Sequence, residues 1–243
     1  MNKIKIKNKQ NRIPKWEDAA ERLVLYADIM GFKSRVMDNN HETLRNDICR
    51  FRSAWETRMA PFMKADHLRY VQFSDSILIV VNGVDEKMFN LITKAAFCLM
   101  HTAISNRFPI KGVITQGTFT YDKDRELYFG RPLVDAALLH DEIKFYGVVV
   151  HNSAEATVKA KMNEENRYCK SEIPLEKGST SHYHLAWNLV NQQYKPIDIT
   201  ETCNLWLDVI EEQVSGRPRM YIDNTRKVFQ NDRSQKPVQN EDI

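Results

Sequence analysis

The sequence predicts an α+β fold, a mainly antiparallel sheet with helices packed on one face, and three observations lead to this prediction. Short apolar runs of strand length alternate with longer stretches in which apolar residues recur every three or four positions. Two of the short runs, 68–73 and 77–81, are joined by three residues and are typical of a hairpin. The order of strand, helix, hairpin, helix, strand, helix, strand favours a sandwich of sheet and helices over a parallel doubly wound fold.

The first predicted strand is residues 22–28, a compact apolar run that is too short for a helix and is followed by the turn-like sequence IMGF. A helix is predicted over about 41–63, because its apolar residues fall on one helical face. These residues are Leu44, Ile48, Phe51, Trp55, Met59 and Phe62. The hairpin follows, with Asp75 near its tip.

The remaining elements of the predicted core are a helix over about 87–107, a strand over 110–121, a short helix over 133–143 and a strand over 146–151. Pro109 marks the restart of the chain as a strand, and Pro132 suits the first turn of the short helix. Gly112 and Gly117 lie inside a strand, which indicates a bulge or a close approach by another group.

Beyond residue 151 the patterns are weaker. The polar stretch 161–181 predicts a loop, residues 181–189 alternate like a strand, and residues 205–213 have a helical pattern. The polar residues after Asp223 predict a frayed tail.

The chain has 243 residues, of which 42% are hydrophobic, enough to form one large domain with its own core. The predicted organisation is a flexible basic tail at 1–18, a single domain at 19–222 and a polar tail at 223–243. Within the domain, a core covers about 20–151 and a C-terminal extension covers 152–222.

Charge, cysteine content and hydropathy argue against several classes of function. The net charge is +3, and the excess is concentrated between Met1 and Lys15, so we expect a solvated arm and no nucleic-acid partner. The four cysteines form no C-x-x-C pair, which argues against a zinc cluster or a disulfide framework. No window approaches the ~18 apolar residues of a membrane span, and the N-terminus lacks an apolar signal run, so the expected location is cytoplasmic.

Two aspartates carry the predicted chemistry. Asp28 ends the first apolar strand, where its carboxylate has no obvious partner in the sequence, and Asp75 lies at the hairpin turn. If the first strand pairs with the hairpin, both carboxylates emerge at one end of the sheet as hard oxygen ligands, which suits Mg²⁺ or Mn²⁺ and the phosphates of a nucleotide. For each aspartate alone, the alternative is a turn former or a helix N-cap.

Four short motifs together resemble the catalytic core of class III nucleotidyl cyclases. They are D-I-M-G-F at 28–32, F-S-D-S at 73–76, K-G-V-I-T-Q-G at 111–117 and F-G-R-P-L-V-D-A-A at 129–137. The resemblance covers roughly residues 20–151 and implies the sandwich with a ferredoxin-like palm that this family has. It also implies a homodimer with paired sites at the subunit interface.

The resemblance implies roles for six residues. Asp28 and Asp75 correspond to the catalytic aspartates that bind two divalent ions, Mn²⁺ or Mg²⁺, with the carbonyl of Ile29 as a further metal ligand. The backbone of Gly31 and Phe32, extended to Lys33, corresponds to the segment that cradles the triphosphate, and glycine permits such a close approach.

One further candidate lies in the hairpin. Arg69, Tyr70 and Gln72 lie just before the hairpin turn, where a side chain could reach a base edge or a phosphate, and Arg69 ranks first among them. Ordinary strand decoration is the competing interpretation for each of them.

Four positions depart from the pattern of the purine cyclases. The Asn and Arg that stabilise the transition state in those enzymes correspond to Asp135 and Leu139, and the Asp and Lys that read the purine correspond to Leu127 and Val71. This combination is similar to the pyrimidine cyclases of the Pycsar antiphage systems, whose cyclic UMP or cyclic CMP activates an effector. The expected substrate is therefore a pyrimidine nucleoside triphosphate, with UTP favoured over CTP.

The implied reaction is an in-line attack of the ribose 3′-hydroxyl on the α-phosphorus, with release of pyrophosphate. Two alternatives stay open. One is a purine cyclase with unusual base contacts, against which Leu127 argues. The other is a catalytically silent cyclase-like domain that binds a nucleotide or a partner; the departures at 135 and 139 favour it, whereas Asp28 and Asp75 argue against it.

Overall fold

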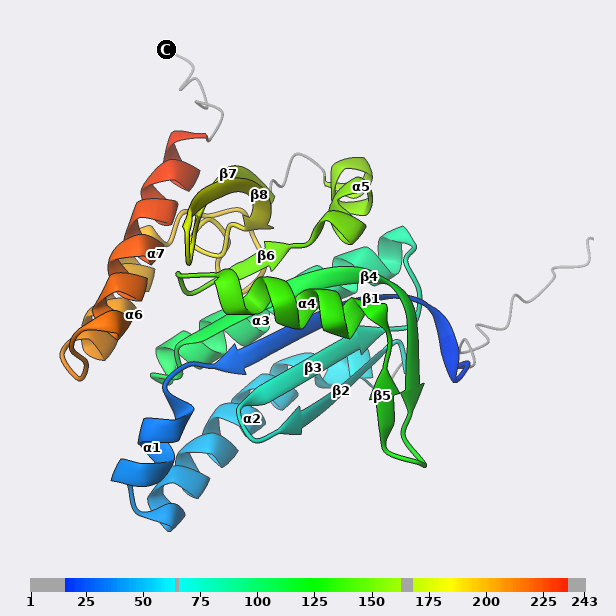
Figure 1. Ribbon diagram of the computed structural model, residues 1–243, viewed down its shortest axis with the longest axis horizontal. Coiled ribbons are helices and arrows are strands. Elements are labelled where there is room, and N and C mark those ends of the chain that lie inside the picture. The colour runs from blue at the N-terminus through cyan, green and yellow to red at the C-terminus, as the bar shows by residue number, and fades with distance from the viewer. Residues whose placement is uncertain (1–15, 64–65, 163–167, 236–243) are drawn as a thin grey trace, which may run out of the picture.

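A single sheet forms the centre of the molecule (Figure 1). The computed structural model describes residues 16–63, 66–162 and 168–235, and within them the strand order is β2-β3-β1-β4-β6-β8-β7, with β5 paired to β4. Neighbouring strands are antiparallel except β4 and β6, which are parallel. The predicted α+β class with a mainly antiparallel sheet is confirmed.

The strands are β1 (Ala19–Ile29), β2 (Leu68–Phe73), β3 (Ser76–Val81), β4 (Ile110–Asp122), β5 (Leu127–Phe129), β6 (Val148–Val150), β7 (Tyr168–Leu175) and β8 (Gly178–Leu185). The strands predicted at 22–28 and 110–121 and the hairpin at 68–81 are confirmed to within a few residues. β1 lies between β3 and β4, so it is the strand that brings the hairpin next to the second half of the core.

The helices are α1 (Phe32–Asp38), α2 (His41–Met63), α3 (Glu86–Ser105), α4 (Arg131–Glu142), α5 (Asn152–Lys161), α6 (Thr200–Glu211) and α7 (Arg217–Ser234). The periodic patterns at 41–63, 87–107 and 133–143 correctly predicted α2, α3 and α4. The start of α3 is fixed by Asp85, whose side chain accepts a 2.9 Å hydrogen bond from the Met88 amide.

Helices cover both faces of the sheet, which corrects the predicted packing of helices on one face. Leu23 and Leu25 of β1 point toward α2 and α3, whereas Val24 and Tyr26 point to the opposite face, where α4 lies (Figure 1). A strand with apolar residues on both sides must be covered on both sides. The unbroken apolar run of β1 therefore explains why α4 packs across from α2 and α3.

The polar stretch 161–181 was predicted to be a loop, and this is wrong for residues 168–175, which form β7. Residues 163–167 of the stretch lie outside the described residues. In β7, Tyr168 and Ile173 are buried while Lys170 and Glu172 are exposed, so the outward charged residues concealed the strand pattern. The strand predicted at 181–189 begins earlier, at Gly178, because it forms a hairpin with β7.

The predicted frayed tail from Asp223 is also wrong up to residue 234, since α7 continues that far. Val228 and Phe229 are buried, and Asp232, which is 1% exposed, makes a 2.7 Å contact with His184 of β8. The residues that bury one face of α7 recur every three or four positions, and packing of that face stabilises a helix that is otherwise polar. Residues 236–243 of the predicted tail lie outside the described residues.

At the N-terminal end, the predicted flexible tail at 1–18 is corrected at one position. Trp16 is only 8% exposed and packs against Tyr121, with ring centroids 5.5 Å apart. Residues 1–15, including the lysine-rich arm, lie outside the described residues. No helix in the described part of the chain combines the length and the apolar character that crossing a membrane requires.

Candidate active site

Asp28 and Asp75 lie next to each other at one end of the sheet. In the ladder between β1 and β3, Asp28 is paired with Ser76, the residue after Asp75. The amide of Ile29 donates a 3.0 Å hydrogen bond to the carbonyl of Asp75. Ser74 has a φ of 55°, a left-handed conformation that allows the hairpin to turn tightly at this point. The expectation that strand pairing brings both aspartates together is met in the backbone.

The two oxygens of the Asp28 carboxylate have different surroundings. Oδ2 accepts a 2.8 Å hydrogen bond from the hydroxyl of Tyr26, which is itself 3.3 Å from Oγ of Ser76. Oδ1 is buried and has no hydrogen-bond partner among the described residues. A buried carboxylate oxygen without a partner is costly, so this atom is suited to a cation.

The Tyr26 hydroxyl is held in its neutral, donating form. The pKa of Tyr26 is raised to about 12, mainly by burial and also by the hydrogen bond to Asp28 and the negative charges of Asp28 and Asp75. The hydroxyl therefore donates to Asp28 at any physiological pH. Because Asp75 acts on the same hydroxyl, its carboxylate belongs to the same cluster, and within the described residues it has no hydrogen-bond or ion-pair partner of its own.

His140, in the last turn of α4, is a residue that the sequence did not reveal. Its Nε2 lies 3.7 Å from Oδ2 of Asp28, too far for a hydrogen bond, and its ring meets Tyr26 edge-on at 5.4 Å. Burial lowers the pKa of His140, and the positive charge of Lys111 lowers it further. A neutral imidazole does not neutralise Asp28, so the nearby positive charge that acts on this carboxylate is that of Lys111.

Lys111 is the second residue that the sequence did not reveal. It is the cross-strand neighbour of Asp28 in β4, is only 3% exposed, and donates to the carbonyls of His140 at 2.7 Å and Ile143 at 3.2 Å. These bonds satisfy the C-terminal end of α4. Burial lowers the pKa of Lys111 to about 8, because removing the ammonium from water disfavours its charge. The signal in the sequence was a lysine beginning an otherwise apolar strand.

Solved structures of cyclase domains have this architecture. The adenylyl cyclase CyaB from P. aeruginosa matches with a TM-score of 0.53 and 12% identity, over 70% of this chain and 96% of that one. The catalytic core of a rhodopsin-guanylyl cyclase with converted specificity, in complex with ATPαS, gives 0.54 and 13%, over 70% and 98%. The guanylate cyclase domain of RhGC from Catenaria anguillulae, in complex with GTP, gives 0.52 and 12%, over 68% and 95%.

The chain has the fold of nucleotidyl cyclase domains. No protein-family model matches the sequence, and no curated protein matches it. At identities of 12–13% the likeness establishes the cyclase fold, and the activity has to be argued from the residues at the site.

Within the cyclase fold, Arg69 does not lie beside the carboxylate pair. It is the second residue of β2, opposite Val80, whereas Asp75 lies at the other end of the hairpin. Its guanidinium makes two 3.0 Å hydrogen bonds to the carboxylate of Asp66 and stacks on Trp16 at 4.3 Å. These contacts support the strand-decoration interpretation within one chain, and a nucleotide contact for Arg69 stays a prediction.

The predicted phosphate-binding backbone follows directly after β1. Gly31 has a φ of 72°, a conformation that favours glycine, and space for a Cβ atom is open around it. Ile29 is 2% exposed, and Phe32 packs partly against the main core. The chain therefore turns sharply next to Asp28, and the exposed backbone at Gly31 is accessible to a ligand.

The positions that depart from the purine-cyclase pattern lie around α4 and the sheet. Asp135 forms an ion pair with Arg131 at 3.3 Å, and Leu139 packs against a cluster that contains Val113. Val71 is half-buried against a cluster that contains Val24 and Leu78, and Leu127 of β5 is 46% exposed. Neither Asp135 nor Leu139 can place a positive charge near a reacting phosphate.

The carboxylate pair suits a divalent metal ion that is shared with a substrate. Among the described residues, no group of three or more His, Cys, Asp or Glu side chains is arranged to hold a metal. Magnesium is commonly bound by only one or two carboxylates together with substrate phosphates. The orphaned Oδ1 of Asp28 fits that type of site, and the hydrogen bond from Ile29 to the carbonyl of Asp75 holds the Asp75 turn beside it.

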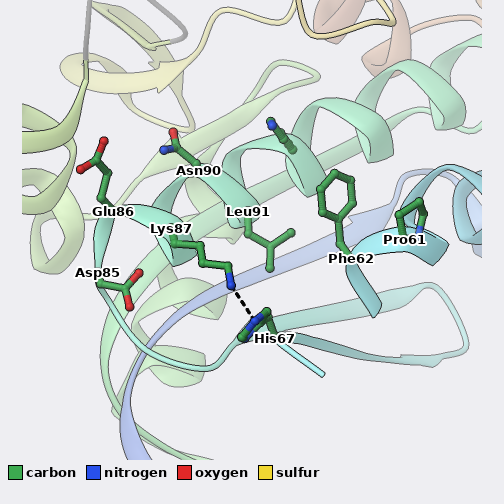
Figure 2. Close-up of a pocket in the computed structure, with 9 residues that line it drawn as sticks. Pro61, Phe62, His67, Asp85, Glu86, Lys87, Asn90 and Leu91 are labelled. Atoms are coloured by element: carbon green, nitrogen blue, oxygen red, sulfur yellow. Dashed lines mark hydrogen bonds between the residues drawn. The ribbon is translucent and has the colours of Figure 1, made fainter. Parts of the chain in front are cut away.

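A separate hollow of about 690 Å³ lies between the end of α2 and the start of α3 (Figure 2). Nζ of Lys87 is 2.7 Å from Nε2 of His67 within it, and Asp85 and Glu86 balance the charge of the lysines. His67 precedes β2, at the opposite end of the hairpin from Asp75. This hollow is therefore distinct from the carboxylate pair, and its mixed charges favour no particular class of ligand.

Proposed function

We propose that the chain is a nucleotidyl cyclase whose active site is built on Asp28 and Asp75. The observation that carries the proposal is the buried, unpartnered Oδ1 of Asp28 beside the Asp75 turn, in a fold shared with adenylyl and guanylyl cyclase domains. Two adjacent carboxylates with open oxygens are suited to Mg²⁺ or Mn²⁺ and repel a polyphosphate unless a cation is present.

Asp28, Asp75 and the carbonyl of Ile29 would hold two divalent ions. When bound, such ions supply Lewis acidity and neutralise negative charge on the phosphates. Tyr26 donates to one oxygen of Asp28 and so fixes the orientation of that carboxylate. The backbone at Gly31 and Phe32 would lie along the triphosphate.

The proposed reaction converts one nucleoside triphosphate into one cyclic nucleotide and one pyrophosphate. The 3′-oxygen of the ribose forms a bond to the α-phosphorus, the bond from that phosphorus to the bridging oxygen of the β-phosphate breaks, and pyrophosphate leaves. The hydroxyl proton passes to solvent. Burial lowers the pKa of His140, so its ring is neutral. The ring lies near the site, with Nε2 3.7 Å from Oδ2 of Asp28, and no role as a base is assigned to it.

A pyrimidine triphosphate is the proposed substrate, with UTP ahead of CTP. Leu127 and Val71 offer no charged or hydrogen-bonding side chain for the edge of a purine, and this supports the resemblance to the Pycsar cyclases. By the same resemblance, the cyclic nucleotide would act as a second messenger on an effector in antiphage defence. The nearest rival is a purine cyclase that reads its base through other groups.

A homodimer is proposed as the active form, and exposed apolar side chains support it. Val134 and Leu138, one turn apart on α4, are 59% and 66% exposed. Leu127 and Phe129 of β5, the strand that leads into α4, are 46% and 54% exposed. Large apolar side chains exposed on neighbouring segments are typical of a surface that a partner covers.

The substrate assignment is tested by incubating the purified chain with ATP, GTP, CTP and UTP in turn, with Mn²⁺, and identifying the products by mass spectrometry. The expected result is cyclic UMP, with less cyclic CMP, and little cyclic AMP or cyclic GMP. Cyclic purine nucleotides alone would support the purine alternative. No cyclic product from any triphosphate would support the catalytically silent domain.

A further inference from the structure

A cavity of about 570 Å³ adjoins the carboxylate pair, between α1, the start of β4 and the turn that joins α6 to α7. Gly31 contributes to its wall, and Lys111 connects it to Asp28, the cross-strand neighbour of that lysine. The α6–α7 turn lies at the end of the sheet where β1 leads into α1 (Figure 1). Part of the C-terminal extension therefore forms a wall beside the proposed active site.

The cavity is strongly positive. Its described lining includes four cations, Arg35, Lys111, Lys144 and Arg217, and one carboxylate, Asp38. A volume of several hundred cubic ångströms is typical of pockets that bind small molecules. The excess of positive charge restricts the ligand to an anion.

Two of these cations are almost fully buried, which makes the excess charge costly without a ligand. Lys111 is 3% exposed and Lys144 is 6% exposed. Lys111 donates to two carbonyls, and the carboxylates of Asp28 and Asp141 act on its charge without coming within ion-pair distance. An ammonium has three N–H donors, so one is still available. Buried charges are normally paired, so Lys111 is suited to a negative group in the cavity.

Lys144 and Arg217 share a single carboxylate at the surface. Glu176 forms an ion pair with Lys144 and a 2.9 Å ion pair with Arg217, and its side chain is 51% exposed. Arg217 is 64% exposed and begins α7, directly after the α6–α7 turn. One carboxylate cannot neutralise both cations, so each keeps donors available for a second anion.

We propose that Arg217, which the C-terminal extension contributes to the cavity wall, is a substrate-binding residue that contacts the pyrophosphate end of the nucleotide. The inference rests on the proposed cyclase function, because it takes the phosphates to extend from Asp28 and Asp75 past Gly31 into the cavity. A diphosphate carries several negative charges on a short, flexible group, which suits four cations around one space. The same contacts stabilise pyrophosphate as it separates from the α-phosphorus.

The direct test is binding of inorganic pyrophosphate to the full chain in EDTA, measured by isothermal titration calorimetry. The unmodified chain is expected to bind pyrophosphate at least ~10-fold more tightly than orthophosphate, since more of the cations are engaged. Arg217→Gln is expected to weaken binding by roughly 10-fold, in line with the loss of one charge-assisted hydrogen bond. Lys227→Gln, an exposed cation on the same helix, is the matched control and is expected to have no effect.

A second measurement separates this inference from the cyclase proposal. In the turnover assay, Arg217→Gln is expected to raise KM for the triphosphate more than it lowers kcat. The inference would be overturned if pyrophosphate did not bind, bound no more tightly than orthophosphate, or bound equally well to Arg217→Gln. The cyclase proposal would still stand in each of these cases. Pyrophosphate binding that depends on Arg217, without any cyclic product, would support the cavity and overturn the cyclase function.

Discussion

The carboxylate of Asp28 is bonded on one side and open on the other. Tyr26 fixes Oδ2, while Oδ1 is buried and unpartnered among the described residues. A fully satisfied carboxylate would have little to offer a metal ion, and an unrestrained one would lose entropy on binding. The hydrogen bond from Tyr26 therefore orients the group without occupying both oxygens.

Tyr26→Phe is expected to weaken Mn²⁺ binding by roughly 10-fold while the protein remains folded, because a supporting hydrogen bond to a ligand is lost but the ring is retained. Titration of Mn²⁺ followed by electron paramagnetic resonance measures the change. Tyr183→Phe, on β8, is a control with the same chemical change away from the site. Equal affinities for Mn²⁺ in both variants and the unmodified chain would contradict a positioning role for Tyr26.

At individual positions, the sequence revealed some features and concealed others for physical reasons. Asp28 and Asp75 could be predicted because a charge directly after an apolar run stands out locally. Gly112 was predicted to allow a close approach, and a Cβ atom there would lie 2.8 Å from the carbonyl oxygen of Tyr26. His140 reaches the site through packing of the α4 end, and Lys111 through the pairing of β4 with β1, and both are long-range contacts that no local pattern encodes.

Among the elements, α7 shows most clearly how packing overrides local composition. Its sequence is mostly polar, yet Phe229 is 1% exposed and meets Trp187 edge-on at 4.7 Å. The buried contact between Asp232 and His184 joins α7 to β8. β7 was missed for a related reason, since charged outward residues alternate with buried ones over a short span. Both elements become stable through their partners rather than through their own propensities.

Phe229→Ala is expected to lower the free energy of unfolding by about 3–5 kcal/mol, because it leaves a cavity beside Trp187. Urea unfolding followed by tryptophan fluorescence measures this loss. Lys227→Ala, two residues earlier and exposed, is expected to change the stability by less than about 0.5 kcal/mol. A Phe229→Ala variant as stable as Lys227→Ala would show that α7 is not part of the cooperative fold.

For the whole molecule, the arrangement of the sheet connects the proposed chemistry to assembly. The α4 helix carries His140 next to Asp28 at one end and exposes Val134 and Leu138 along its outer side. Covering that side with a second copy of the chain would bring another subunit close to the carboxylate pair. The structure of one chain therefore supports a link between dimer formation and activity in the proposed function.

Leu138→Glu is expected to convert a dimer to a monomer and to lower cyclase activity at least ~10-fold, because a charge replaces an apolar side chain at the proposed interface. Light scattering coupled to size-exclusion chromatography gives the oligomeric state. Leu205→Glu, on α6 and 65% exposed, is the matched control. A Leu138→Glu variant with the mass and activity of the Leu205→Glu variant would rule out this face as the dimer interface.

The overall architecture was more predictable than the C-terminal part, because the core elements from β1 to β6 have strong periodic patterns. The extension depends on contacts with that core, and so its contribution to the cavity near Gly31 emerges only from the structure. The likeness to adenylyl and guanylyl cyclase domains establishes the fold. The proposed activity rests on the two aspartates.

The most direct test compares cyclic UMP formation from UTP and Mn²⁺ by the unmodified chain, Asp28→Asn, Asp75→Asn and the control Asp223→Asn, an exposed aspartate on α7. Asp28→Asn and Asp75→Asn are each expected to lose at least ~1,000-fold in kcat with unchanged circular dichroism, while the control remains fully active. Near-normal activity in either site variant would contradict the assignment of Asp28 and Asp75 as the metal-binding catalytic pair.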